Sequence, residues 1–137
     1  MKRFVALFLV LVCAATMLAG CQEQTAPTEQ PDVVENVTIQ IGDVTPTGAT
    51  VTITDTNETP FIYGEWYKIQ RKTDQGWQDV APVIKDSTFT AIGYFPNGNG
   101  QVKFTIDWQW LYGQLPSGTY RLWKEVGTQK ICAQFTI

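Results

Sequence analysis

The chain has 137 residues, with 10 basic and 13 acidic side chains, three cysteines and no histidine. Without histidine, neither a Ser-His-Asp nor a Cys-His catalytic arrangement can form, nor can a metal site built on imidazole. The formal net charge of -3 argues against nucleic acid as a partner, because nucleic-acid-binding proteins present a basic surface. The length fits a single domain, and we predict no cofactor and no metal site.

Residues 1–20 have the order of parts that is typical of a secretory signal peptide. Lys2 and Arg3 form a short positive region, an unbroken apolar run covers positions 4–12, and small residues precede position 21. The apolar run is too short for a comfortable membrane span. We therefore predict that residues 1–20 are removed as a signal peptide, with an uncleaved anchor helix as the alternative.

The end of this segment, Leu18-Ala19-Gly20-Cys21, resembles the bacterial lipobox. The resemblance implies cleavage before Cys21 and lipidation of that cysteine. Several acyl chains, at ~0.8 kcal/mol per buried methylene, hold a protein on a membrane almost permanently. We therefore expect an extracytoplasmic protein that lipid anchors to the bacterial cell membrane. The alternative is an ordinary secretory cleavage site with a free cysteine beside it.

Residues 21–36 are predicted to be the lipidated cysteine and a flexible linker. Pro27 and Pro31 oppose regular structure, and apolar residues are sparse. An extended stretch of this kind reaches about 45 Å and would hold the following domain off the lipid surface. Alternatively, Val33 and Val34 begin an edge strand.

From about residue 37 onward the pattern indicates β-structure. In residues 101–110 apolar and polar side chains alternate, which indicates a half-buried antiparallel strand, with Trp108 and Trp110 on its apolar face. Residues 48–54 and 131–137 alternate in the same way. Further strands are predicted at 36–41, 62–72, 77–80, 88–95 and 119–126, the C-terminal strand has the bounds 130–137, and there is one helical turn at most, at 110–114.

Seven to eight strands in about 100 residues are typical of an all-β, immunoglobulin-like antiparallel β-sandwich, here over residues 37–137. A closed barrel is the alternative. Tyr120 is the second residue of the strand that follows the turn at 115–118, which suits a tyrosine corner, where the hydroxyl bonds back to upstream backbone. Leu122 stands where antibody domains carry their second disulfide cysteine, so the antibody disulfide is absent.

Four short patterns resemble a bacterial Ig-like domain. They are Tyr63-Gly64-x-x-Tyr67, Gly76-Trp77, Trp108-x-Trp110-Leu111-Tyr112-Gly113 and Leu115-Pro116-x-Gly118-x-Tyr120-Arg121. The resemblance covers roughly residues 36–137. This family occurs in lipoproteins of Gram-positive bacteria and beside peptidases of the BlaR1 type. It has no established catalytic set, so the resemblance implies a fold and a location and no enzyme activity.

Cys132 is the one candidate for a reactive side chain. The alternation of its strand points it away from the core, and a nucleophilic cysteine needs a base or a cation to lower its pKa. Only Lys130 and Arg121 could approach it, so we favour a passive residue on the face of a sheet.

The carboxylates are scattered, and no pair is compelled to meet as a glycosidase requires. Asp55 and Glu58 share a loop with Asn57 and could bind calcium weakly, although their spacing is not that of an EF-hand. We therefore interpret the carboxylates as solvated loop and strand charges. The residues considered are Asp55, Glu58, Glu65, Asp107 and Glu125.

Two tryptophans do not fit the apolar faces of their strands. If Tyr67 points into the core, Trp66 points outward, and if Tyr120 points inward, Trp123 points outward. Tryptophans framed by charges indicate an interaction surface, while the competing interpretations are cation–π packing between strands or cover from the linker. The predicted binding face contains Trp66, Lys68, Arg121, Trp123 and Glu125, with Cys132 and Gln134 beside them.

The predicted function is that of a lipid-anchored, non-catalytic module that binds an envelope protein as an accessory or a sensor. It would expose one sheet face and the end loops 55–60 and 96–100. The alternative is a carbohydrate-binding module, in which Trp66, Trp123 or Tyr94 stacks on sugar rings of the cell wall. An envelope hydrolase is a third hypothesis, but its catalytic residues cannot be assembled from this sequence.

Overall fold

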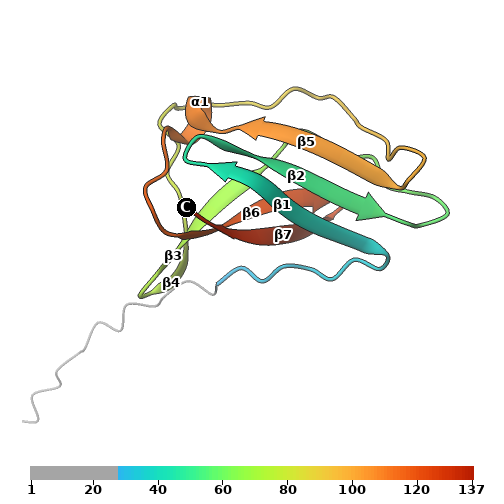
Figure 1. Cartoon of the computed structure of the whole chain (residues 1–137), viewed down its shortest axis with the longest axis horizontal. Coiled ribbons are helices and arrows are strands. Elements are labelled where there is room, and N and C mark those ends of the chain that lie inside the picture. The colour runs from blue at the N-terminus through green and yellow to red at the C-terminus, as the bar shows by residue number, and fades with distance from the viewer. Residues whose placement is uncertain (1–27) are drawn as a thin grey trace, which may run out of the picture.

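Two antiparallel sheets pack face to face in the computed structural model, which describes residues 28–137 (Figure 1). The predicted signal peptide and Cys21 lie outside the described residues. One sheet has the order β1-β2-β5 and the other the order β4-β3-β6-β7. The prediction of an all-β, Ig-like sandwich is confirmed.

The strands and one short helix have the following bounds. The first sheet contains β1 (Val37–Thr45), β2 (Gly48–Asp55) and β5 (Gln101–Asp107). The second sheet contains β3 (Lys68–Thr73), β4 (Gly76–Asp79), β6 (Thr119–Val126) and β7 (Gln129–Thr136). The helix α1 (Gln109–Tyr112) follows β5, and within residues 28–137 no helix is long and apolar enough to cross a membrane.

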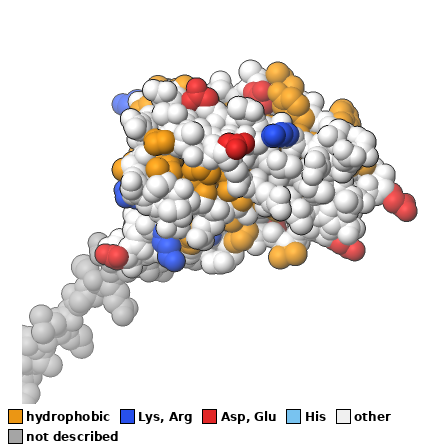
Figure 2. Space-filling model, viewed as in Figure 1, with side chains coloured by type: hydrophobic (Ala, Val, Ile, Leu, Met, Phe, Trp, Pro, Cys, Tyr) orange, Lys and Arg blue, Asp and Glu red, His pale blue; other side chains and the backbone are white. Residues whose placement is uncertain are grey.

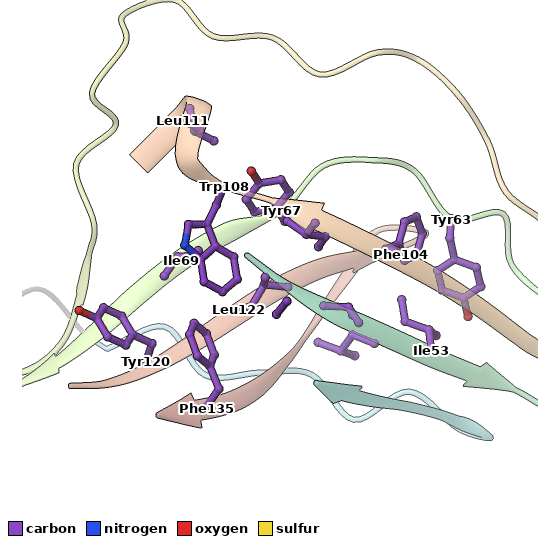
Figure 3. Packing of buried hydrophobic residues seen from close by; sticks show 14 of the residues in the cluster. Ile53, Tyr63, Tyr67, Ile69, Phe104, Trp108, Leu111, Tyr120, Leu122 and Phe135 are labelled. Atoms are coloured by element: carbon purple, nitrogen blue, oxygen red, sulfur yellow. The ribbon is translucent and has the colours of Figure 1, made fainter. Parts of the chain in front are cut away.

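The core fills the space between the sheets with aromatic and branched side chains (Figure 3). β5 shows why the alternation predicts a strand: its apolar residues are buried and its polar residues are exposed. The ring of Phe135 lies 5.4 Å from that of Trp108 and 5.5 Å from that of Tyr120, measured between centroids. Burial of each such side chain contributes roughly 1.5–3 kcal/mol to folding.

The strand predicted at 101–110 ends earlier, at Asp107. The Asp107 carboxylate accepts the backbone N–H of Gln109 at 2.9 Å and turns the chain into α1. Trp108 remains in the core and donates its indole N–H to the carbonyl of Pro46 at 2.9 Å. Trp110, which the alternation assigned to the same apolar face, is instead 43% exposed.

The strands predicted at 62–72 and 88–95 are also shorter or absent. The first is reduced to β3, and the second contributes only an isolated bridge between Tyr63 and Tyr94. Gly64 and Gly93 flank this bridge, and glycine weakens a strand because it offers no side chain to pack.

A tyrosine fixes the connection that leads into β6. The Tyr120 hydroxyl donates a hydrogen bond to the carbonyl of Pro116 at 2.6 Å, four residues upstream. This is the geometry of a tyrosine corner. The turn of the hairpin formed by β3 and β4 ends at Gly76, whose φ of +99° is one that glycine adopts without strain.

Residues 28–34, here named the strap, run along the second sheet and join its edge strand β7 (Figure 1). The Asp32 N–H donates to the Lys130 carbonyl at 2.8 Å, and the Lys130 N–H donates to the Asp32 carboxylate at 2.8 Å. Val34 enters the hydrophobic core. These contacts tie residues 28–34 to the domain, within the segment 21–36 that the sequence predicted to be lipidated cysteine and linker.

The strap begins and ends at opposite ends of the sandwich. Thr28 lies beside the β3–β4 hairpin, with its hydroxyl 3.4 Å from the position that a Cβ would take at Gly76. The loops 55–60 and 96–100 lie together at the other end, joined by a hydrogen bond from the Asp55 N–H to the Gly100 carbonyl at 2.7 Å (Figure 1).

Candidate functional site

The predicted binding face lies on the outer side of the second sheet, where strand pairing brings its residues together. Lys68 is opposite Trp123, and Trp123 is opposite Cys132. Their accessibility differs from that of an open surface: Trp123 is fully buried and Arg121 is 5% exposed. Trp66 and Lys68 are half-buried, Cys132 is half-buried, and Glu125 and Gln134 are exposed.

Arg121 is the centre of this face. Its guanidinium lies 4.6 Å from the ring centroids of both Trp77 and Trp123, which places the cation between two aromatic faces. Its Nε donates to the amide oxygen of Gln70 at 2.7 Å, and the indole N–H of Trp123 donates to the same oxygen at 2.9 Å. Gln70 in turn donates to Asp79 at 2.6 Å. The charge of Arg121 is thereby satisfied within the protein.

The strap covers this cluster through Glu29. Its backbone carbonyl accepts a hydrogen bond from Arg121 Nη2 at 2.6 Å, and its carboxylate pairs with Lys68 and, at 3.6 Å, with Lys130. The hydrogen bond from Lys68 is the main cause that lowers the pKa of Glu29 below its ordinary value. Trp123 and Arg121 are thus out of reach of solvent while the strap is in place. Trp77, Gln70 and Glu29 belong to this cluster although the sequence analysis did not single them out.

The environment of Cys132 does not favour a nucleophile. Burial raises the pKa of its thiol, and the opposing effect of Arg121 is smaller. A raised pKa reduces the fraction of thiolate, which is the reactive form. The geometry therefore supports a passive role for Cys132 on the face of the sheet.

Asp55 is a buried structural carboxylate and not a solvated loop charge. One of its oxygens accepts the backbone N–H and side-chain amide of Asn57, at 3.0 and 2.8 Å. The other accepts the N–H of Phe61 and the hydroxyl of Tyr63, both at 2.8 Å. Burial alone would raise the pKa of Asp55, but these hydrogen bonds outweigh it and lower the pKa. Because all four contacts are internal, Asp55 shapes the loop 55–60.

The remaining carboxylates lie apart from one another. Glu65 accepts hydrogen bonds from Thr90 and, at 2.8 Å, from Tyr94, while Glu58, Asp107 and Glu125 are exposed. Among residues 28–137, no group of three His, Cys, Asp or Glu side chains is placed to hold a metal ion.

Lys124 is a buried cation that the sequence analysis did not single out. It is 1% exposed, its amine donates to the carbonyl of Gly64 at 2.7 Å, and it lies 3.9 Å from the ring centroid of Phe104. Burial lowers its pKa to about 8, against the opposing effect of Glu65. The signal was present in the sequence, because position 124 shares the inward face of β6 with Tyr120 and Leu122.

A cleft of about 180 Å³ lies where the free edge of β5 meets α1 and the chain around residues 65–67 and 89. It too was missed, because its residues come from four separate segments. The face of the molecule shown in Figure 2 carries scattered charges and small hydrophobic groups, with no extended patch of one charge. The side chains that define the cleft are Glu65, Tyr67, Phe89, Phe104, Asp107 and Trp110.

A family model described as bacterial Ig-like domain matches residues 33–136. No curated protein and no solved structure matches the chain. The matched region begins at Val33, which precedes β1 and belongs to the strap, so the family pattern includes part of the segment that we predicted to be linker.

Proposed function

This chain belongs to the bacterial Ig-like domain family, and from that premise we propose that it is a lipid-anchored, non-catalytic binding module outside the cytoplasmic membrane. It would serve an envelope protein as an accessory or a sensor. The family match supports a non-catalytic extracellular domain, and the lipobox-like Leu18–Cys21 supports the anchor.

The observation that carries the proposal is the position of the strap. The chain reaches the domain at Thr28, beside the β3–β4 hairpin, while the loops 55–60 and 96–100 lie at the opposite end (Figure 1). If Cys21 carries the lipid, only residues 22–27 separate it from the strap. Six extended residues span at most about 20 Å, which is less than half of the reach predicted for the whole linker. Such an anchor would hold the hairpin near the membrane and present the two loops away from it.

The absence of a catalytic role is supported by the state of the reactive candidates. The pKa of Cys132 is raised, the carboxylate of Asp55 is fully occupied by internal donors, and Arg121 is enclosed between two tryptophans. None of these groups is poised to act on a substrate.

Substitution of single cysteines tests the anchor. In bacteria fed an alkyne-labelled fatty acid, the wild-type protein should carry the label and sediment with membranes. The Cys21→Ser variant should lose the label and leave the membrane fraction, because no thiol remains at the lipidation position. Cys132→Ser is the matched control and should keep both properties. Labelling of Cys21→Ser at the wild-type level would refute the anchor.

A cell-wall glycan is the alternative ligand. The three aromatic residues predicted to stack on sugar rings differ in their surroundings. Trp123 is buried, and Tyr94 packs its ring 5.4 Å from Phe104 and donates its hydroxyl to Glu65. Trp66 is half-buried, with the Lys130 amine 5.4 Å from its ring centroid. Retention of the protein on purified cell wall, lost in Trp66→Ser, would replace the protein-binding proposal with the glycan-binding one.

A further inference from the structure

The cleft beside β5 has four aromatic side chains in its walls. The rings of Tyr67 and Phe89 are 5.1 Å apart and inclined by 66°, and those of Phe89 and Trp110 are 5.8 Å apart and inclined by 76°. Each ring thus meets its neighbour edge to face. Trp110 adds an aromatic side chain that is 43% exposed and lies outside the hydrophobic core. Tyr67 and Phe104, both labelled in Figure 3, come from the chain just before β3 and from β5.

Two carboxylates complete the cleft, and no lysine or arginine is among the side chains that line it. The pKa of Glu65 is lowered mainly by the hydrogen bond from Thr90 and next by that from Tyr94, so this carboxylate is ionised at neutral pH. Asp107 is exposed, and one of its oxygens caps the backbone of Gln109. The buried cation Lys124 contacts the ring of Phe104 and also lowers the pKa of Glu65 slightly through its charge, but it is 1% exposed and does not line the cleft.

One hydroxyl at the cleft is buried without a hydrogen bond of good geometry. Tyr67 is 5% exposed and lines the cleft, and the only effect of a neighbour on its hydroxyl that resembles a hydrogen bond is that of the Trp110 side chain, which lowers its pKa against the larger effect of burial. Buried polar groups in proteins are nearly always hydrogen-bonded, because an unpaired one costs free energy. A ligand in the cleft that offers a donor or an acceptor would remove this cost.

We propose that this cleft binds the ammonium end of a lysine side chain from a partner protein. Cations are attracted both to aromatic faces and to carboxylates, and the cleft offers both. Its volume equals that of about six water molecules, which suits a slender side chain better than a large ligand. The protein source of the lysine rests on the binding role proposed above, while the preference for ammonium rests on the cleft alone.

The test uses the protein purified in micelles of a neutral polyoxyethylene detergent, which brings neither a cation nor a sugar. Nα-acetyl-lysine methylamide is titrated while NMR follows the indole N–H of Trp110 and the backbone N–H of Asp107. We expect saturable shifts with a Kd in the millimolar range, as for a single cation site near the surface. The norleucine analogue has the same stem without the charge and should bind at least about tenfold more weakly. Equal binding of norleucine, shifts with the neutral sugar N-acetylglucosamine but not with the lysine amide, or no saturable shift would overturn the proposal.

Two variants separate ligand binding from folding. Tyr67→Phe keeps the ring and removes the unpaired hydroxyl, so it should raise the melting temperature and yet weaken lysine binding about three- to tenfold. Asp107→Asn keeps the acceptor for Gln109 and removes the charge, and should weaken binding by a similar factor. Asp74→Asn, on the β3–β4 turn, is the control and should change nothing. A folded Asp107→Asn protein with unchanged affinity would also overturn the proposal. These outcomes are independent of the Cys21 experiment, so failure of one leaves the other intact.

Discussion

Lys124 carries its charge into the interior of the sandwich with one hydrogen bond and one aromatic ring as partners. Burial of a cation is costly, and its pKa falls to about 8 as a result. Between this value and the ordinary 10.5, the unfolded chain binds a proton that the folded chain has released. Linkage then requires the free energy of unfolding to increase as the pH rises through this window.

The Lys124→Met variant tests this linkage. Methionine fills a similar volume without a charge, so the variant should match or exceed the wild type in stability at pH 7. From about pH 7 to 9.5 the free energy of unfolding of the wild type should rise by about 2 kcal/mol relative to that of the variant. Denaturant unfolding at both pH values measures the difference. The buried tyrosines and Cys132 titrate in both proteins, and their effects cancel. Parallel pH dependence in the two proteins would show that Lys124 does not change its protonation on unfolding.

At the scale of elements, the strap changes the boundary of the domain. Val34 is 8% exposed and packs in the core, whereas its neighbour Val33 is 95% exposed. The backbone bonds between Asp32 and Lys130 lie beside this anchor residue. The strap is therefore held by the Val34 side chain, the hydrogen bonds between Asp32 and Lys130, and the polar contacts of Glu29.

The two valines form a matched pair for a mutational test. Val34→Ala should destabilise the protein by about 1–2 kcal/mol through lost burial, and the Lys130 amide should exchange its hydrogen faster. Val33→Ala should leave the free energy of unfolding within about 0.5 kcal/mol of the wild type and the exchange of the Lys130 amide unchanged. Thermal unfolding and hydrogen exchange provide the measurements. Equal effects of the two substitutions would mean that the strap contributes no more than a solvated linker.

The sequence predicts elements well where one strand faces both core and solvent. β5 and β7 are recognisable because their apolar residues alternate with polar ones, and the Tyr120 corner is recognisable from its turn. The prediction of a strand at 88–95 was wrong, because this segment pairs with another only at the Tyr63–Tyr94 bridge. Its aromatic side chains are instead held by packing, Phe89 against Tyr67 and Tyr94 against Phe104.

The candidate site was less accessible to sequence analysis. The alternation that places Trp123 and Arg121 on the outer face of the sheet says nothing of what lies over them, and the strap comes from a proline-containing stretch 92 residues away from Arg121. The cleft combines residues of β5 and α1 with Glu65, Tyr67 and Phe89 from segments far away in the sequence, so no local pattern predicts it. Lys124 stands apart, since its position on the inward face of β6 could be inferred from the same alternation that was applied to its neighbours.

For the whole molecule, the anchor and the strap together imply an orientation. The domain would stand with the β3–β4 hairpin toward the membrane and the loop 96–100 away from it. The strands of the sandwich separate these ends by roughly 25 Å, at about 3.3 Å per residue. If the proposed lipid anchor is present, a short tether and a bound strap would restrict the loops to a layer above the lipid surface, where a partner could reach them.

Two labelling sites distinguish this orientation from free tumbling. In a Cys132→Ser background, fluorophores are attached to Asp74→Cys on the hairpin and to Gly98→Cys on the distal loop, where added side-chain atoms meet no neighbour. In lipid vesicles that contain an acceptor dye, energy transfer should be stronger from position 74, because transfer falls steeply with distance. Adding a flexible Gly-Ser segment after residue 27 should reduce this difference, since a longer tether samples more orientations. Equal transfer from both sites with the natural tether would contradict the orientation while leaving the lipid anchor itself intact.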